Sequence, residues 1–177
     1  MENYKMRKAA LALVIGAASL IGSVAHAEDT PFYIGVEGTQ AHFSDDALSR
    51  ENSTGVKVYG GYNFTSRIAV EGEVGTTNGY RAVTGDRARV TDAGVSLKVS
   101  QPIGHGLTAY GKVGMLYQDL NVSNIGSTNG FNPVFGAGVE YGLTKKVSLR
   151  LEDELTPRIA DVHDVYNSVN FGLTYKF

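Results

Sequence analysis

Apolar and polar residues alternate along most of the chain after residue 31, with the period of two that a half-buried β-strand requires. In one such segment, Ile68 and Val70 fall on one face and Glu71 falls on the other. Eight segments follow this pattern, at residues 32–42, 55–64, 68–75, 90–100, 107–117, 134–143, 147–155 and 166–177. The pattern therefore predicts an all-β fold of eight strands, each with one apolar and one polar face.

The connections between these segments alternate in length. The short ones are residues 65–67, 102–106 and 144–146, and the long ones are 43–54, 76–89, 118–132 and 156–165. Short turns at one end, long loops at the other and an even number of strands of about ten residues are typical of outer-membrane barrels. The sequence thus predicts an eight-stranded antiparallel up-and-down transmembrane β-barrel.

Alternation alone also fits a soluble barrel of the lipocalin type, in which the apolar face surrounds a ligand. Three features favour a membrane barrel. Aromatic residues lie near the ends of the apolar faces, where they would form interfacial girdles. They are Phe32, Tyr62, Phe64, Tyr117, Tyr141, Tyr175 and Phe177. The polar faces carry charges of both signs, which would pair inside a small barrel, and the sequence ends on a strand segment rather than on a helix. We therefore expect the apolar face to lie against lipid.

Asp153 is an exception, because it falls on the apolar face of segment 147–155. A carboxylate facing lipid is costly. Either a β-bulge or a shorter apolar band on that side of the barrel would relieve the cost, and the sequence leaves both explanations open.

The first 27 residues have the pattern of a cleaved export signal. Basic residues at positions 5, 7 and 8 precede an apolar stretch at 9–24, and Ala25-His26-Ala27 supplies a small-x-small cleavage site. Without this signal, residues 28–177 carry 13 basic and 17 acidic residues, a net charge of −4. This balance argues against a nucleic-acid surface, which would be basic. The absence of cysteine excludes disulfides and thiolate metal sites.

Three segments resemble small outer-membrane barrels of the outer-membrane protein A/X type, a group that includes the opacity-type porins. They are GVKVYGGYNFTSRIAVEGEVG (55–75), NPVFGAGVEYGLTKKVSLRLEDEL (132–155) and NFGLTYKF (170–177). The resemblance covers most of residues 31–177 and carries no expectation of a peptidoglycan-binding domain. It implies a monomer in the outer membrane, among lipids and lipopolysaccharide, delivered by periplasmic chaperones and the barrel-assembly machinery. It also implies that this machinery recognises a terminal signal formed by Phe171, Leu173, Tyr175 and Phe177.

The polar faces supply the first candidate site, a charged barrel interior. Seven acidic and five basic residues fall on these faces, the bases being Lys57, Lys98, Lys112, Arg150 and Lys176. Those expected to form an ion-pair plug or a gate are Glu37, Lys57, Glu71, Glu73, Lys112, Glu140, Arg150 and Glu152. Eight strands leave an interior about large enough for side chains alone. A plug is therefore the first interpretation, and a narrow gated channel, in which Arg150 and Lys112 exchange carboxylate partners, is the alternative.

The predicted loops supply the remaining candidates. Arg81, Arg87 and Arg89 give one loop a basic character that suits lipopolysaccharide phosphates or another surface ligand. A lipid A-modifying enzyme would need histidine with serine and an acid at the outer rim. The residues available for that role are His42, Ser44, Asp161, His163, Asp164 and Ser168, and they form no motif. Asp45 and Asp46 lack a calcium-loop pattern. We expect neither catalysis nor a metal or cofactor, and predict a structural barrel with surface contacts.

Overall fold

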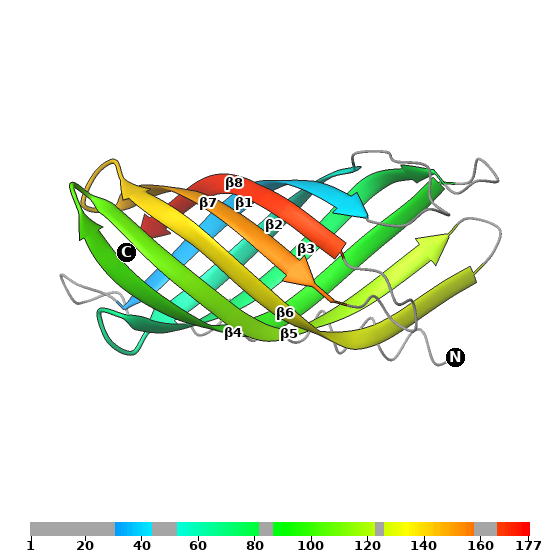
Figure 1. Ribbon diagram of the computed structural model, residues 1–177, viewed down its shortest axis with the longest axis horizontal. Coiled ribbons are helices and arrows are strands. Elements are labelled where there is room, and N and C mark those ends of the chain that lie inside the picture. The colour runs from blue at the N-terminus through cyan, green and yellow to red at the C-terminus, as the bar shows by residue number, and fades with distance from the viewer. Residues whose placement is uncertain (1–30, 44–52, 82–86, 123–125, 158–165) are drawn as a thin grey trace.

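The computed structural model describes residues 31–43, 53–81, 87–122, 126–157 and 166–177, and these form one closed antiparallel barrel (Figure 1). The strands are β1 (Phe32–Phe43), β2 (Ser53–Asn63), β3 (Ile68–Arg81), β4 (Arg87–Gly104), β5 (Leu107–Val122), β6 (Gly126–Gly142), β7 (Val147–Thr156) and β8 (Tyr166–Lys176). Each strand pairs with its neighbours in chain order, and β8 closes the barrel against β1. The predicted eight-stranded up-and-down barrel is thus confirmed.

No helix among the described residues is long and apolar enough to cross a membrane.

The register of the strands determines the tilt of the barrel. Directly opposed residues can be followed from strand to strand around the whole circumference. The path runs through Phe32, Tyr62, Val70, Leu97, Val113, Phe135, Leu155, Asn167 and His42. It returns to β1 ten residues beyond its start, at residue 42 instead of residue 32. With eight strands and standard strand spacings, this shift corresponds to a strand tilt of about 40°.

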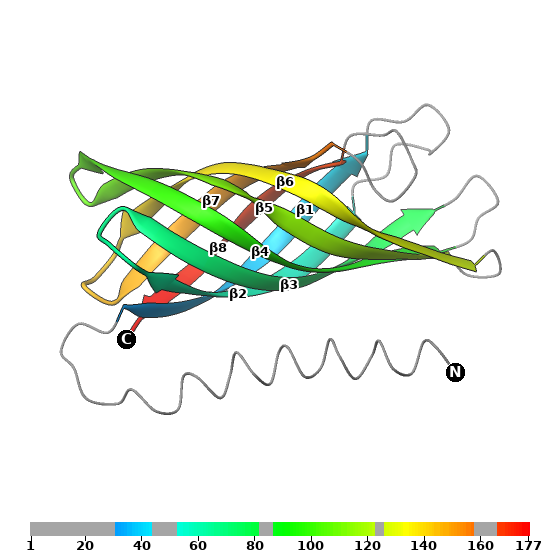
Figure 2. The same ribbon diagram turned by 90° about the horizontal axis from the view of Figure 1, so that it is seen from below.

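The apolar face of each strand lies on the outside of the barrel, as the sequence predicts. Side chains such as Val58, Val95 and Leu173 are exposed there, whereas the opposite faces are buried and mostly polar. Aromatic rings pair on the outside near the short turns, with centroids 5.0 Å apart for Phe32 and Tyr62 and 5.3 Å apart for Tyr175 and Phe177. We call this the turn end, which carries residues 64–67, 105–106 and 143–146, and Figure 2 shows the C-terminus there.

The opposite end, where β1, β3 and β5 finish, is the loop end. The predicted loops 76–89 and 118–132 are wrong in extent, because β3 and β5 run on to Arg81 and Val122 and stay paired with β4 and β6. The alternation of apolar residues stops before the hydrogen bonds between the strands do. The reason is that the part of the sheet beyond the lipid needs no apolar face. As a result β4, β5 and β6 extend beyond β7 and β8 at this end (Figure 1).

Asp153 faces outward and is exposed, as the alternation predicts. No bulge relieves it, because β7 pairs with β8 without a register shift from Val147 to Thr156. Asn167 donates a hydrogen bond of 2.9 Å to Asp153 Oδ1, and Gln40 on the neighbouring strand is exposed as well. Asp153 therefore has polar neighbours on the outward face, although Val169 and Leu155 beside it are apolar and exposed.

We predict that Gly172→Ala destabilises the barrel by about 1–3 kcal/mol, because a new Cβ here has no room. It would overlap the carbonyl oxygen of Val36 and lie 2.6 Å from Glu37 Cγ. Urea unfolding of the barrel refolded in lipid or detergent measures this loss. Gly38→Ala is the matched control, since its nearest neighbour, the Phe171 carbonyl oxygen, would be 3.9 Å away. Equal stability of the two variants would contradict the prediction.

Candidate functional site

Among the described residues, eleven charged side chains point into the barrel, and each is at most 7% exposed. The acidic ones are Glu37, Glu71, Glu73, Asp92, Glu140, Glu152 and Glu154, and the basic ones are Lys57, Lys98, Lys112 and Arg150. They come from β1 to β7, and the strict alternation of each strand directs them to the same side. Glycines between them leave room for the long side chains: a Cβ at Gly136, for example, would lie 3.2 Å from Lys112 Cε.

Arg150 is the centre of the half of this network nearer the turn end. It binds Glu71 through two parallel contacts of 2.9 and 3.0 Å, and Glu152 at 2.5 Å. Its Nε donates to the hydroxyl of Tyr110 at 2.7 Å. The guanidinium carbon lies 4.2 Å from the ring centre of Tyr59 and 4.8 Å from that of Tyr110. Arg150 thereby connects β7 to β3 across the interior, with two aromatic faces fixing its plane.

Lys98 extends the network towards β6. Its ammonium group pairs with Glu140 and lies 3.3 Å from Glu71 Oε1. It also lies 4.4 Å from the ring centre of Tyr110 and 5.2 Å from that of Tyr33. The Tyr33 hydroxyl in turn donates to Glu71 at 2.8 Å. Glu71 thus serves an arginine, a lysine and a tyrosine from three other strands.

The half nearer the loop end contains two lysines that share their carboxylates. Lys112 binds Glu73 at 2.7 Å, Glu152 at 2.8 Å and Glu154 at 3.0 Å. Lys57 binds the other oxygen of Glu73 at 3.0 Å and the same oxygen of Glu154 at 2.7 Å. Because Glu152 also binds Arg150, the two halves form one continuous network.

Two acidic side chains are incompletely satisfied. Glu37 Oε1 lies 3.0 Å from Arg150 Nε, but that N–H donates to Tyr110, and neither oxygen of Glu37 accepts a hydrogen bond from the described residues. Asp92 forms no ion pair within the described part of the chain, and its Oδ1 lacks a hydrogen-bond partner there. The interior therefore holds more negative charge than its own cations neutralise.

All eight predicted interior residues lie in this network, although their roles stay predictions. The prediction that Lys176 is the fifth interior base is wrong. Lys176 is the last residue of β8 and lies exposed at the rim of the barrel. The acids therefore outnumber the bases by three rather than two. No role was predicted for Tyr33, Tyr59 and Tyr110, although alternation places these three on the polar faces of their strands.

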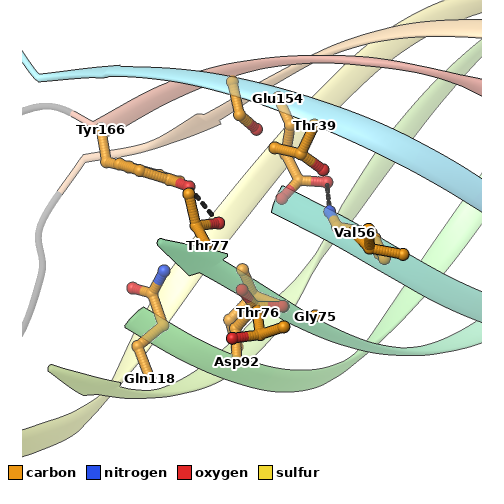
Figure 3. Close-up of a pocket in the computed structure, with 12 residues that line it drawn as sticks. Thr39, Val56, Gly75, Thr76, Thr77, Asp92, Gln118, Glu154 and Tyr166 are labelled. Carbon is orange, nitrogen blue, oxygen red and sulfur yellow. Dashed lines mark hydrogen bonds and ion pairs between the residues drawn. The ribbon is translucent and has the colours of Figure 1, made fainter. Parts of the chain in front are cut away.

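A small cavity lies where the network ends towards the loop end (Figure 3). Its lining includes Lys57, Asp92, Gln118, Glu154 and Tyr166. The space for solvent is about 10 Å³, which is about the least that one water molecule needs. Side chains thus fill most of the interior at this level.

The arginines of the predicted basic loop lie at the loop end of β3 and β4. Arg81 is directly opposite Arg87 in the sheet, and Arg89 is opposite Asn78. Arg89 is exposed, and its Nε donates to Asn78 Oδ1 at 2.7 Å. The three arginines therefore occupy one paired hairpin rather than a long loop.

The remaining candidates are only partly described. Phe171, Leu173, Tyr175 and Phe177 face outward and are exposed, as predicted for the terminal signal. The backbone of His42 pairs with Asn167, while Ser168 is buried in the interior. Outside the described residues lie the signal at 1–27 and the residues Ser44, Asp45, Asp46, Asp161, His163 and Asp164. Within the described ranges, no group of three or more His, Cys, Asp or Glu residues is arranged to hold a metal ion.

Comparison with known proteins identifies the family. A family model described as an outer membrane protein beta-barrel domain matches residues 9–177. Outer membrane protein A of Escherichia coli O157:H7 is 26% identical to this chain, over 97% of the chain and 55% of that protein. Outer membrane protein P5 of Haemophilus influenzae is 29% identical, over 97% of the chain and 61% of that protein. The chain thus spans little more than half the length of these relatives.

Solved structures give the same fold at lower identity. The Neisserial surface protein A superimposes with a TM-score of 0.67 at 15% identity, covering 85% of this chain and all of that one. The attachment invasion locus protein Ail of Yersinia pestis, in complex with the heparin analogue sucrose octasulfate, superimposes with a TM-score of 0.63 at 17% identity. That match covers 84% of this chain and 99% of Ail. At such identities the likeness establishes the fold alone.

We predict that Arg150→Met lowers the free energy of unfolding by about 3–5 kcal/mol, because it leaves Glu71 and Glu152 buried with fewer cationic partners. Urea titration of the refolded barrel measures the change. Circular dichroism follows the unfolding, because the chain contains no tryptophan for fluorescence. Arg67→Met is the control, since Arg67 is exposed in a short turn and its loss is expected to cost less than about 0.5 kcal/mol. A loss at position 150 as small as that at position 67 would show that the network contributes little to stability.

Proposed function

The chain belongs to the outer membrane protein beta-barrel family, and from this premise we propose that it is a structural barrel whose loop end makes contacts at the cell surface. Membership of the family places it in the outer membrane. Since long loops of such barrels face the cell exterior and short turns face the periplasm, the loop end is the extracellular one.

The continuous ion-pair network is the observation that carries a structural role. Each of the four interior cations contacts at least two carboxylates, as Lys57 does with Glu73 and Glu154. A cation can leave its place only if several buried contacts break together, and each buried charge left behind is costly. Arg150 is further held between Tyr59 and Tyr110. This arrangement favours a plug that fixes the register of the strands over a conduit.

Export and assembly complete the proposal. Residues 1–27 would be cleaved as the signal, leaving the mature domain 28–177, and the outward row Phe171, Leu173, Tyr175 and Phe177 would be the signal for the barrel-assembly machinery after transit with periplasmic chaperones. The mature protein would act as a monomer without catalytic activity, so lipid A modification is the least favoured role. Antiparallel pairing closes the barrel from β1 round to β8, which supports a monomer, although β6 runs beyond its pairing with β7 at the loop end.

A surface ligand is the second part of the proposal. Arg81, Arg87 and Arg89 belong to one hairpin at the loop end, and their charge suits lipopolysaccharide phosphates or sulfated sugars. The structural relative Ail was solved with a sulfated sugar analogue, which makes an anionic saccharide a reasonable ligand class to test. Host proteins are the alternative surface partner.

We expect the refolded protein to show no discrete conductance steps in a planar lipid bilayer, because the interior is filled by paired side chains. The same preparation unfolded by boiling is the control. Discrete steps in the wild type that change in Arg150→Ala would instead establish the gated channel. Steps that persist unchanged in Arg150→Ala would show a conduit that Arg150 does not gate.

We expect the triple variant Arg81→Gln, Arg87→Gln, Arg89→Gln to bind lipopolysaccharide at least tenfold more weakly than the wild type. The reason is that one charge-assisted contact is worth about 1.5–3 kcal/mol and about 1.4 kcal/mol corresponds to tenfold in affinity. Surface plasmon resonance on immobilised lipopolysaccharide, repeated on heparin, measures the effect. Arg67→Gln at the opposite end should bind like the wild type. Unchanged binding of the triple variant would exclude this hairpin as the site.

A further inference from the structure

The cavity at the outer end of the network contains two buried polar atoms that the described protein does not satisfy. Asp92 Oδ1 and Gln118 Nε2 have no hydrogen-bond partner there, although Asp92 is only 7% exposed and Gln118 only 1%. The two residues are directly opposed on β4 and β5, and both line the cavity (Figure 3). An unsatisfied buried carboxylate oxygen is expensive, so a ligand that contacts it would be stabilised.

The neighbouring strand is adapted to this carboxylate. Gly75 on β3 is directly opposite Asp92, and an added Cβ at Gly75 would lie 2.6 Å from Asp92 Oδ1. Any larger residue at position 75 would push the Asp92 carboxylate out of its place. The glycine therefore keeps space for the carboxylate beside the cavity.

The amide of Gln118 can present oxygen as well as nitrogen to the cavity. Its Oε1 accepts a hydrogen bond of 2.9 Å from Asn132 Nδ2. If both amides rotate by half a turn, Gln118 donates to Asn132 instead, the hydrogen bond is kept, and Gln118 Oε1 faces the cavity. The hydroxyl residues Thr39, Thr77 and Ser168 line the same space. One carboxylate and several neutral oxygens can therefore surround a ligand there.

Charge decides which kind of ligand this environment suits. The described interior holds seven acidic and four basic side chains, and Asp92 is the acid that no cation pairs with. Lys57, which also lines the cavity, is held by Glu73 and Glu154. A positive ligand is thus favoured over a neutral one. Asp92 is the carboxylate at the cavity that has no cationic partner among the described residues, and no group of three metal-ligating side chains lies within them. A divalent ion would therefore find too few charged ligands here.

We propose that this cavity is a binding site for one monovalent cation of about the size of water, such as potassium or ammonium, held by Asp92 and the neutral oxygens around it. The volume of about 10 Å³ admits one such ion without its hydration shell. The ion would neutralise Asp92 and connect β4 with β5 at the extracellular end of the network. The site is independent of the surface role proposed above, since it lies inside the barrel.

Rubidium, which scatters X-rays anomalously and substitutes for potassium, identifies the ligand directly. Crystals of the refolded mature barrel grown in rubidium chloride should show an anomalous peak in the cavity beside Asp92. The peak should vanish in Asp92→Asn and persist in Asp119→Asn, the matched control, because Asp119 follows Gln118 in the chain but lies on the outward face of β5. Electron density in the cavity without an anomalous signal would identify a water molecule. A Lys57 side chain that pairs with Asp92 would show that the protein itself supplies the cation. Either result would overturn the proposal.

Solution NMR of the barrel in micelles gives a second readout. Replacing N-methylglucamine chloride by potassium chloride at constant ionic strength should shift the side-chain amide signals of Gln118 in a saturable way. The shift should be lost in Asp92→Asn and retained in Asp119→Asn. If Asp92→Asn does not fold, Gly75→Ala, which displaces the same carboxylate, takes its place. A shift that never saturates, or that survives in these variants, would refute a specific cation site.

Discussion

Lipid offers no hydrogen-bond partner to a peptide group, and the rest of this structure depends on that constraint. A sheet in a membrane must close on itself so that every strand is paired. Closing eight strands with a shift of ten residues leaves an interior about as wide as side chains require. Each strand then has one face in lipid and one face in a narrow space without bulk water. The polar faces must satisfy one another inside this space.

Arg150 shows how the interior meets this demand. Its guanidinium group has a planar array of donors that can serve two carboxylates and a tyrosine hydroxyl at once, while its faces lie against two rings. A lysine in its place would offer a point charge without this planar fit. The lysines of the network occur instead where carboxylates converge from several directions, as around Lys112. The excess of acids over bases leaves Asp92 and Glu37 as the groups that the cations do not satisfy.

The two ends of the barrel differ because different demands act on them. At the turn end, three short connections and paired aromatic rings hold the strands at the membrane boundary. At the loop end, β3 to β6 continue as a paired sheet after the apolar alternation has stopped. A rigid scaffold with an extended edge of this kind is well suited to recognition, while the filled interior provides its stability.

The sequence by itself determined the number and order of the strands, and which face of each meets lipid, because side chains alternate with a period of two whatever their partners are. It also placed all eight candidate charges inside. Only the tertiary structure decided which charges meet. Arg150 pairs with Glu71 across the barrel, 79 positions apart in sequence, because the register shift sets the height of every residue. The same register left Lys176 outside and brought Asn167 within hydrogen-bond distance of Asp153 without a bulge. These outcomes depend on how all eight strands are offset around the closed barrel, which no single strand encodes.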